Sequence, residues 1–130
     1  MATREPIQPL FICYARCSTC AKARTWLDRH GMSYRERDIK GDNPTYGELK
    51  HWLAMSGLPV RRFFNTSGMV YRALPHDQRP DHLSEEEALR LLATDGMLVK
   101  RPILVDGDQV LVGFHLSDWE RHLNTETHRI

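Results

Sequence analysis

Short apolar runs and amphipathic stretches alternate along the first part of the chain. Leu10 to Tyr14 is an apolar run with the length of one buried strand. Ser18 to His30 has apolar residues at helical spacing, and Gly31 favours a helix end there. Met32 to Ile39 alternates apolar and polar residues, which predicts a second strand. A strand, a helix and a strand in this order predict a βαβ unit with parallel strands.

The middle of the chain is predicted to be helical. Ser84 and Glu87 have the spacing of a capping box, which favours a helix beginning at this point. The elements expected here are a helix opened by Asn43-Pro44-Thr45 and ended by Gly57 and Pro59, a short helix over Arg61–Phe64, a turn over Asn65–Gly68, a loop over Leu74–Asp81 and a helix from Ser84 to near Gly96.

The last part of the chain predicts a β-hairpin followed by a helix. Pro102–Val105 and Gln109–Val112 flank the turn signal Asp106-Gly107. A helix is expected over Ser117–Leu123, with a frayed polar tail over Asn124–Ile130. The order β-α-β, helices, β-β-α predicts an α/β, thioredoxin-like (glutaredoxin-like) fold. Its mixed sheet would have a helical insertion between the two halves, in one domain over 1–130 with a core over about 10–123.

Composition narrows the class of protein. Hydrophobic residues make up 41% and charged residues 27% of the 130 residues, as in ordinary globular domains. A formal net charge of +1 gives no support for direct nucleic-acid binding. Met1 to Pro9 lacks the apolar core of a signal peptide, and no apolar run is long enough to span a membrane. With three cysteines and no disulfide framework, we expect a cytoplasmic protein.

The first candidate for chemistry is the pair Cys17 and Cys20, at the junction of the first strand and helix. A helix N-terminus favours an anion, and the thiolate is the nucleophilic form of cysteine. We therefore expect Cys17 to be the nucleophile. Cys20 follows one turn later on the same face, where it could resolve a disulfide with Cys17.

Other interpretations of the cysteines remain open. The pair could be two inert core thiols, or half of a zinc site, although neither a second CxxC nor a nearby histidine pair completes such a site. Cys13, within the first strand, is interpreted as a small buried hydrophobe that points away from the helix cap and stays reduced. A resolving role for Cys13 is the less favoured alternative.

Three further positions are candidate site residues. Arg101 and Pro102 open a hairpin strand, where a thioredoxin-like fold would pack a cis proline against the active-site helix and bring a cation near the thiolate. A solvated arginine at a strand edge is the competing interpretation. Arg16 adds a cation beside Cys17. Asn65 could belong to a hydrogen-bonding loop at the site, although a turn of Asx type is favoured.

A combination of motifs resembles the bacterial ArsC/Spx family, which includes glutaredoxin-coupled arsenate reductases, the thiol-stress regulator Spx and MgsR-like proteins. The resemblance extends over about Leu10 to Leu123 and implies the same fold. The segments concerned are Tyr14, Cys17-Ser18-Thr19-Cys20, Ala21–Leu27, Arg37–Ile39 and Lys100–Val105.

Departures from the family pattern bear on the substrate. In arsenate reductases of this family, Gly-Thr-Ser-Arg follows the cysteine and three arginines surround the oxyanion. Arg101 matches one of these arginines, but Asn65 and Gly113 stand where the other two are expected. The Arg61-Arg62 pair could substitute from a neighbouring turn.

The resemblance implies two functional alternatives. The first is a thiol–disulfide oxidoreductase that acts on arsenate or on a disulfide or glutathione adduct. Its electrons would come from glutathione, glutaredoxin or thioredoxin, with no metal or organic cofactor. The second is an Spx-like regulator whose cysteine pair is a redox switch and whose partner is the C-terminal domain of the RNA polymerase α subunit. Met55–Pro59 lies near the segment that Spx uses for that contact.

Overall fold

A computed structural model describes residues 8–128. Met1–Ile7, Arg129 and Ile130 lie outside the described residues. Within that range the strands form one four-stranded sheet in the order β2-β1-β3-β4. β1 pairs with β2 in parallel and with β3 antiparallel, and β3 pairs with β4 antiparallel. The strands are β1 (Leu10–Cys13), β2 (Arg35–Asp38), β3 (Ile103–Asp106) and β4 (Gln109–Val112). This is the mixed sheet of a thioredoxin-like fold, as expected.

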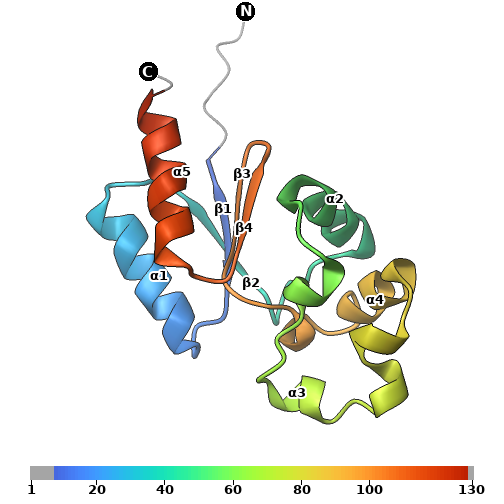
Figure 1. Cartoon of the computed structure of the whole chain (residues 1–130). Coiled ribbons are helices and arrows are strands. Elements are labelled where there is room, and N and C mark those ends of the chain that lie inside the picture. Colours follow the sequence, from blue (N-terminus) through green and yellow to red (C-terminus); the bar gives the residue numbers. More distant parts are fainter. Residues whose placement is uncertain (1–7, 129–130) are drawn as a thin grey trace, which may run out of the picture.

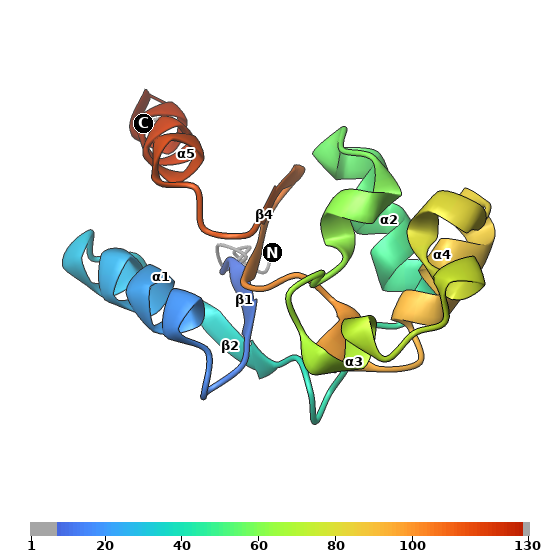
Figure 2. The same cartoon turned by 60° about the horizontal axis from the view of Figure 1, so that its bottom comes forward.

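Helices cover both faces of the sheet (Figure 1). Helices α1 and α5 lie over one face, and the helical insertion between β2 and β3 lies over the other, as the turned view confirms (Figure 2). None of the helices in the described range is long and apolar enough to cross a membrane. The helices are α1 (Ser18–Arg29), α2 (Tyr46–Ser56), α3 (Met69–Arg72), α4 (Glu85–Leu92) and α5 (Leu116–His128), and the 3-10 turns are η1 (Val60–Phe63), η2 (His76–Gln78), η3 (Pro80–His82) and η4 (Gly96–Leu98).

The two-residue periodicity of the central strands divides the core between these faces. Phe11 and Leu104 are register partners and pack toward α1 and α5. Ile12 and Ile103 are the next pair and pack toward α2 and α4. Because successive strand residues point to opposite faces, β1 contributes to both halves of the core.

Some expected elements have different bounds. β2 begins at Arg35 rather than Met32, because its pairing to the sheet begins where Arg35 N–H donates to the carbonyl of Pro9 at 2.8 Å. The expected loop over Leu74–Asp81 contains the turns η2 and η3, and α3 was not predicted. α3 has only four residues, without a buried side chain, so it leaves little periodic signal.

The hairpin turn and the end of α5 differ from the expectations for the C-terminal part of the chain. The hairpin turn consists of Gly107 and Asp108 rather than Asp106-Gly107, since Asp106 pairs with Gln109 as the last residue of β3. Gly107 has a φ of 60°, which suits a tight hairpin turn. α5 continues to His128, so the expected fraying from Asn124 is wrong for the described part of that tail.

The second helix has a capping device that the sequence analysis did not identify. Thr45 accepts a hydrogen bond from Glu48 N–H at 3.1 Å, and Glu48 accepts from Thr45 N–H at 3.0 Å, completing a capping box. Arg37 of β2 donates to both carboxylate oxygens of Glu48, at 2.6 and 2.9 Å. The Arg37 guanidinium, with the Thr45 amide, lowers the pKa of Glu48 from 4.5 to about 2.

The Arg37–Glu48 ion pair predicts that part of the free energy of unfolding is lost in acid. A carboxylate whose pKa falls on folding stabilises the protein above its unfolded pKa, and that contribution is lost as pH falls from about 4.5 to about 2. The Glu48 side chain is 34% exposed, so after solvent screening we expect about 1–2 kcal/mol. Urea unfolding at pH 7 should show Glu48→Gln less stable by that amount, with the difference vanishing near the low end of that pH range.

Glu86→Gln is the matched control for this prediction. Glu86 also pairs with an arginine, Arg90, at 3.1 Å, but both side chains are more than 60% exposed. An exposed pair of this kind contributes little, so its loss should change the free energy of unfolding by under about 0.5 kcal/mol. Equal effects of the two substitutions on the free energy of unfolding at pH 7 would contradict the stabilising role of the Arg37–Glu48 ion pair.

Candidate functional site

The loop from β1 to α1 places Cys17 at the N-cap of α1. Cys17 has extended backbone angles, its N–H donates to the carbonyl of Tyr14 at 3.0 Å, and its carbonyl accepts the first helical bond from Ala21. Its side chain makes no capping hydrogen bond, and the first turn of α1 contains no acidic residue. Cys17 therefore lies, half-buried, at the N-terminus of a twelve-residue helix, the position predicted for it.

Cys20 lies in the core behind Cys17. It is fully buried, and its sulfur accepts a hydrogen bond from Tyr14 N–H at 3.4 Å. The partly buried Cys17 packs against the same core cluster that contains Cys20. All three cysteines are free thiols. The CxxC pair thus combines a half-buried cysteine at the start of α1 with a buried one in the core behind it.

Cys13 is a small buried residue of the core, as predicted, but the expectation that it points away from α1 is wrong. Although it is only 2% exposed, its sulfur accepts a hydrogen bond from Arg24 Nη2 at 3.2 Å and contacts the Cys20 thiol. Cys13 ends β1 and points to the sheet face that α1 covers, so it faces the helix rather than away from it. Cys20 and Arg24 are four residues apart on that helix, which is the signal that could have identified the contact.

The charge around Cys13 is asymmetric. The hydrogen bond donated by the Cys20 thiol, together with Arg24, holds the pKa of Cys13 below its ordinary value, although burial and Glu36 oppose this. That same bond and burial raise the pKa of Cys20 far above its ordinary value. Glu36 of β2 fixes the Arg24 guanidinium through bonds of 3.0 and 3.1 Å. The surroundings of these two buried thiols therefore shift the pKa of Cys13 and that of Cys20 in opposite directions.

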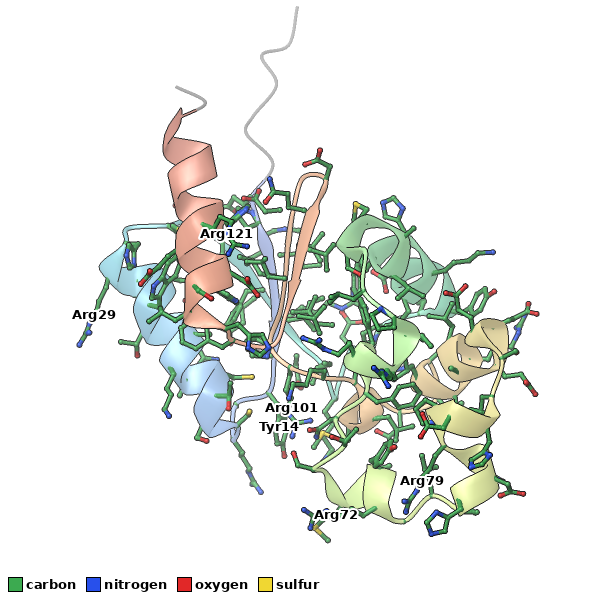
Figure 3. The ribbon with its side chains drawn as sticks, in the orientation of Figure 1. Tyr14, Arg29, Arg72, Arg79, Arg101 and Arg121 are labelled. Carbon is green, nitrogen blue, oxygen red and sulfur yellow. The ribbon has the colours of Figure 1, made fainter. Side chains whose placement is uncertain are left out.

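Arg101 and Pro102 lie at the same end of the sheet. Because Ile12 pairs with Ile103, the residues that follow β1 lie opposite those that precede β3. The Arg101–Pro102 peptide bond is cis. Figure 3 shows Arg101 beside Tyr14 at the end of β1, and its guanidinium carbon is 5.3 Å from the centroid of the Tyr14 ring.

The Arg101 guanidinium has unused donors. Its Nε and Nη1 are buried, and no hydrogen-bond acceptor among the described residues reaches either atom. A solvated arginine at a strand edge would keep these atoms in water, so that alternative does not hold. Buried cationic donors without acceptors are costly, and an anionic ligand would satisfy them.

The other two candidates differ in their placement. Arg16 is exposed in the turn just before Cys17. Asn65 is 9% exposed and belongs to a turn: its N–H donates to the carbonyl of Leu98 at 2.8 Å, and its side-chain oxygen accepts from Ser67. The Asx-type turn interpretation therefore fits Asn65.

Cations other than the family arginines surround this end of the molecule. Arg61, Arg62 and Lys100 line one surface pocket together with Phe64, Thr66 and Tyr71. Gly113 has a φ of 76°, a conformation that favours glycine over arginine. The described residues contain no group of three His, Cys, Asp or Glu side chains placed to hold a metal ion.

Comparison with known proteins identifies the family. The model of the ArsC family matches residues 13–122, which include the whole site. The chain belongs to the ArsC family. It is 46% identical to YusI of Bacillus subtilis (strain 168), over 86% of this chain and 95% of that protein. It is also 32% identical to the global transcriptional regulator Spx 2 of Oceanobacillus iheyensis, over 87% of this chain and 82% of that protein.

A solved structure supports the same assignment. The crystal structure of an ArsC family related protein from Bacteroides fragilis is 49% identical and has a TM-score of 0.85. The match covers 90% of this chain and 98% of that one. The ArsC-family fold predicted from the residues is confirmed, and the chain resembles both arsenate-reductase-like proteins and Spx regulators.

Proposed function

We propose that this ArsC-family protein is a thiol–disulfide oxidoreductase, with Cys17 as nucleophile and Cys20 as resolving thiol. The observation that supports this best is the proximity of the two thiols at the start of α1, where one is accessible and the other is buried. The substrate class is a disulfide or glutathione adduct bearing an anionic group. The electrons come from glutathione, glutaredoxin or thioredoxin, and no metal or organic cofactor takes part.

The chemistry follows from the placement of the sulfurs. The Cys17 thiolate attacks the substrate disulfide, forming a mixed disulfide and releasing the first substrate thiol. Cys20 then attacks the Cys17 sulfur, and its proton leaves with the second substrate thiol. One dithiol protein, or two molecules of glutathione that leave as glutathione disulfide, returns the Cys17–Cys20 disulfide to two thiols. Burial protects Cys20 from direct attack, so that Cys17 is the entry point.

Arg101 binds the anionic part of the substrate in this proposal. Its unpartnered Nε and Nη1 can donate to a carboxylate such as those of glutathione. Stacking on Tyr14 fixes the guanidinium close to the loop that ends at Cys17. Lys100, the residue before Arg101, lines a surface pocket together with Arg61, Arg62 and Asp81, so three cations and one anion face that pocket.

The test is turnover of an S-glutathionylated peptide with glutathione as reductant. Cys17→Ser should abolish turnover, and Arg101→Met should lower kcat/KM by roughly 10- to 100-fold, the equivalent of about 1.5–3 kcal/mol for a charged hydrogen bond. Arg29→Met, at the exposed far end of α1, is the charge-matched control and should leave turnover unchanged. Full activity of Cys17→Ser would contradict the proposal.

The similarity to Spx 2 supports a second candidate, an Spx-like redox regulator. In that case the Cys17–Cys20 disulfide would change the affinity for the C-terminal domain of the RNA polymerase α subunit. A pull-down with that domain separates the candidates. Binding that depends on the oxidation state, without peptide turnover, favours the regulator, whereas turnover without binding favours the enzyme.

A further inference from the structure

The CxxC pair is part of a larger thiol cluster. Cys13 and Cys20 belong to one core cluster against which Cys17 packs, and both Cys13 and Cys17 are close enough to shift the pKa of Cys20. Only Cys17 is half-buried, whereas Cys20 and Cys13 are both buried, at 0% and 2% exposed. One sulfur, that of Cys20, therefore has two neighbouring cysteines with which it could form a disulfide.

Cys13 has a cation as a direct neighbour, although it lies in the core. Its sulfur accepts hydrogen bonds from Arg24 Nη2, at 3.2 Å, and from the Cys20 thiol. Arg24 cannot easily turn away, because Glu36 binds two of its nitrogens and its guanidinium carbon lies 5.9 Å from the Phe11 ring centroid. A merely space-filling cysteine would need neither the cation nor the carboxylate that orients it.

We infer that Cys13 is a third redox-active cysteine, which takes over the Cys17–Cys20 disulfide and stores it as a buried Cys13–Cys20 disulfide. This inference rests on the proposed function, since Cys17 must first react with an external disulfide. It differs from the expectation that Cys13 stays reduced during the redox cycle.

The steps balance without a further oxidant. Glutathione disulfide exchanges with the Cys17 thiolate, giving a Cys17–glutathione mixed disulfide and one glutathione thiolate. Cys20 attacks the Cys17 sulfur, and the second glutathione leaves with the Cys20 proton. The Cys13 thiolate then attacks the Cys20 sulfur. The Cys17–Cys20 bond breaks, the Cys13–Cys20 bond forms, and Cys17 leaves as a thiolate at the positive end of α1.

This transfer has two consequences for the redox cycle. The disulfide moves to Cys13 and Cys20, whose buried sulfurs external reductants do not reach. Cys17 becomes a free thiolate that can react again. The buried disulfide reopens when the Cys17 thiolate attacks Cys20, which reverses the last step. Cys17 is therefore the cysteine through which the disulfide both enters and leaves the cluster of three thiols.

The test treats the full-length protein with glutathione disulfide, blocks the remaining thiols with iodoacetamide and maps the disulfides by peptide mass spectrometry. The predicted main product has a Cys13–Cys20 bond and an alkylated Cys17. A persistent Cys17–Cys20 bond with alkylated Cys13 would overturn the inference but leave the proposed function intact. A protein in which Cys17 does not react at all would overturn both.

Two variants test the route. Cys17→Ser should keep Cys13 and Cys20 reduced, and an inner disulfide forming there at the wild-type rate would overturn the transfer. Arg24→Met should slow the appearance of the inner disulfide by about tenfold, the effect of one pKa unit on the thiolate fraction, without slowing the first glutathione adduct. Arg29→Met, an exposed arginine on the same helix, should slow neither step, and an equal effect of both arginine variants would contradict the role of Arg24.

Discussion

Arsenate should be a very poor substrate, with an affinity roughly two to four orders of magnitude below that of a family member with three arginines. The estimate follows from two missing charge-assisted contacts at about 1.5–3 kcal/mol each. Asn65 and Gly113 occupy the two positions, and Asn65 is used by its own turn. A glutaredoxin-coupled arsenate assay measures this directly, and turnover of the glutathionylated peptide by the same preparation is its control.

The structure also predicts that arginines cannot simply be restored. At Gly113 a side chain would meet His115 and Lys100 at 3.4 Å, on a backbone with positive φ. At position 65 the side chain is 9% exposed and its oxygen accepts from Ser67, so a longer side chain there would disrupt this turn. Rapid arsenate turnover by the unaltered protein would contradict this account and point to Arg61 and Arg62 as the oxyanion ligands.

Trp119→Ala should lower the free energy of unfolding by about 3–5 kcal/mol, the cost of a large cavity in a packed core. Trp119 is 1% exposed and forms edge contacts with the rings of Phe11, Trp26 and Phe114. Its indole N–H also donates to the carbonyl of Gly113 at 3.1 Å. It thereby connects α5, α1 and the sheet on the face that contains the thiol cluster. Urea unfolding followed by circular dichroism measures the loss.

Leu116→Ala, on the same helix, is the matched control. Leu116 is 50% exposed, and truncation of an exposed side chain should change the stability by no more than about 0.5 kcal/mol. A comparable loss of stability in both variants would show that the helix propensity of α5, rather than the buried Trp119 indole, determines the change in the free energy of unfolding.

Hydrophobic periodicity was sufficient to predict the sheet and its two helical layers. Phe11 and Ile12 follow each other in sequence and enter opposite halves of the core, which is the pattern that identifies a central strand. β2 was harder to delimit because it is an edge strand with three exposed residues out of four. The hairpin was predicted one residue out of register, since Asp106-Gly107 and Gly107-Asp108 both suit a turn and the pairing to Gln109 decides between them.

The candidate site was only partly predictable. Cys17 as N-cap and the cis proline followed from motif spacing, because both are local features. The contact of Cys13 with Arg24 is tertiary: it depends on α1 crossing over the end of β1, with Glu36 supplied by a third element. For the same reason the sequence could not distinguish Arg101 in water from Arg101 stacked on Tyr14.

The central claim is that Cys17 is the sulfur that reacts with external disulfides. The most direct measurement is peptide mass spectrometry of Cys20→Ser after treatment with glutathione disulfide, since this variant cannot resolve the adduct. The account predicts one glutathione per chain, attached to Cys17, with Cys13 unmodified because it is buried. A glutathione on Cys13, or no adduct on Cys17 in a folded protein, would contradict it.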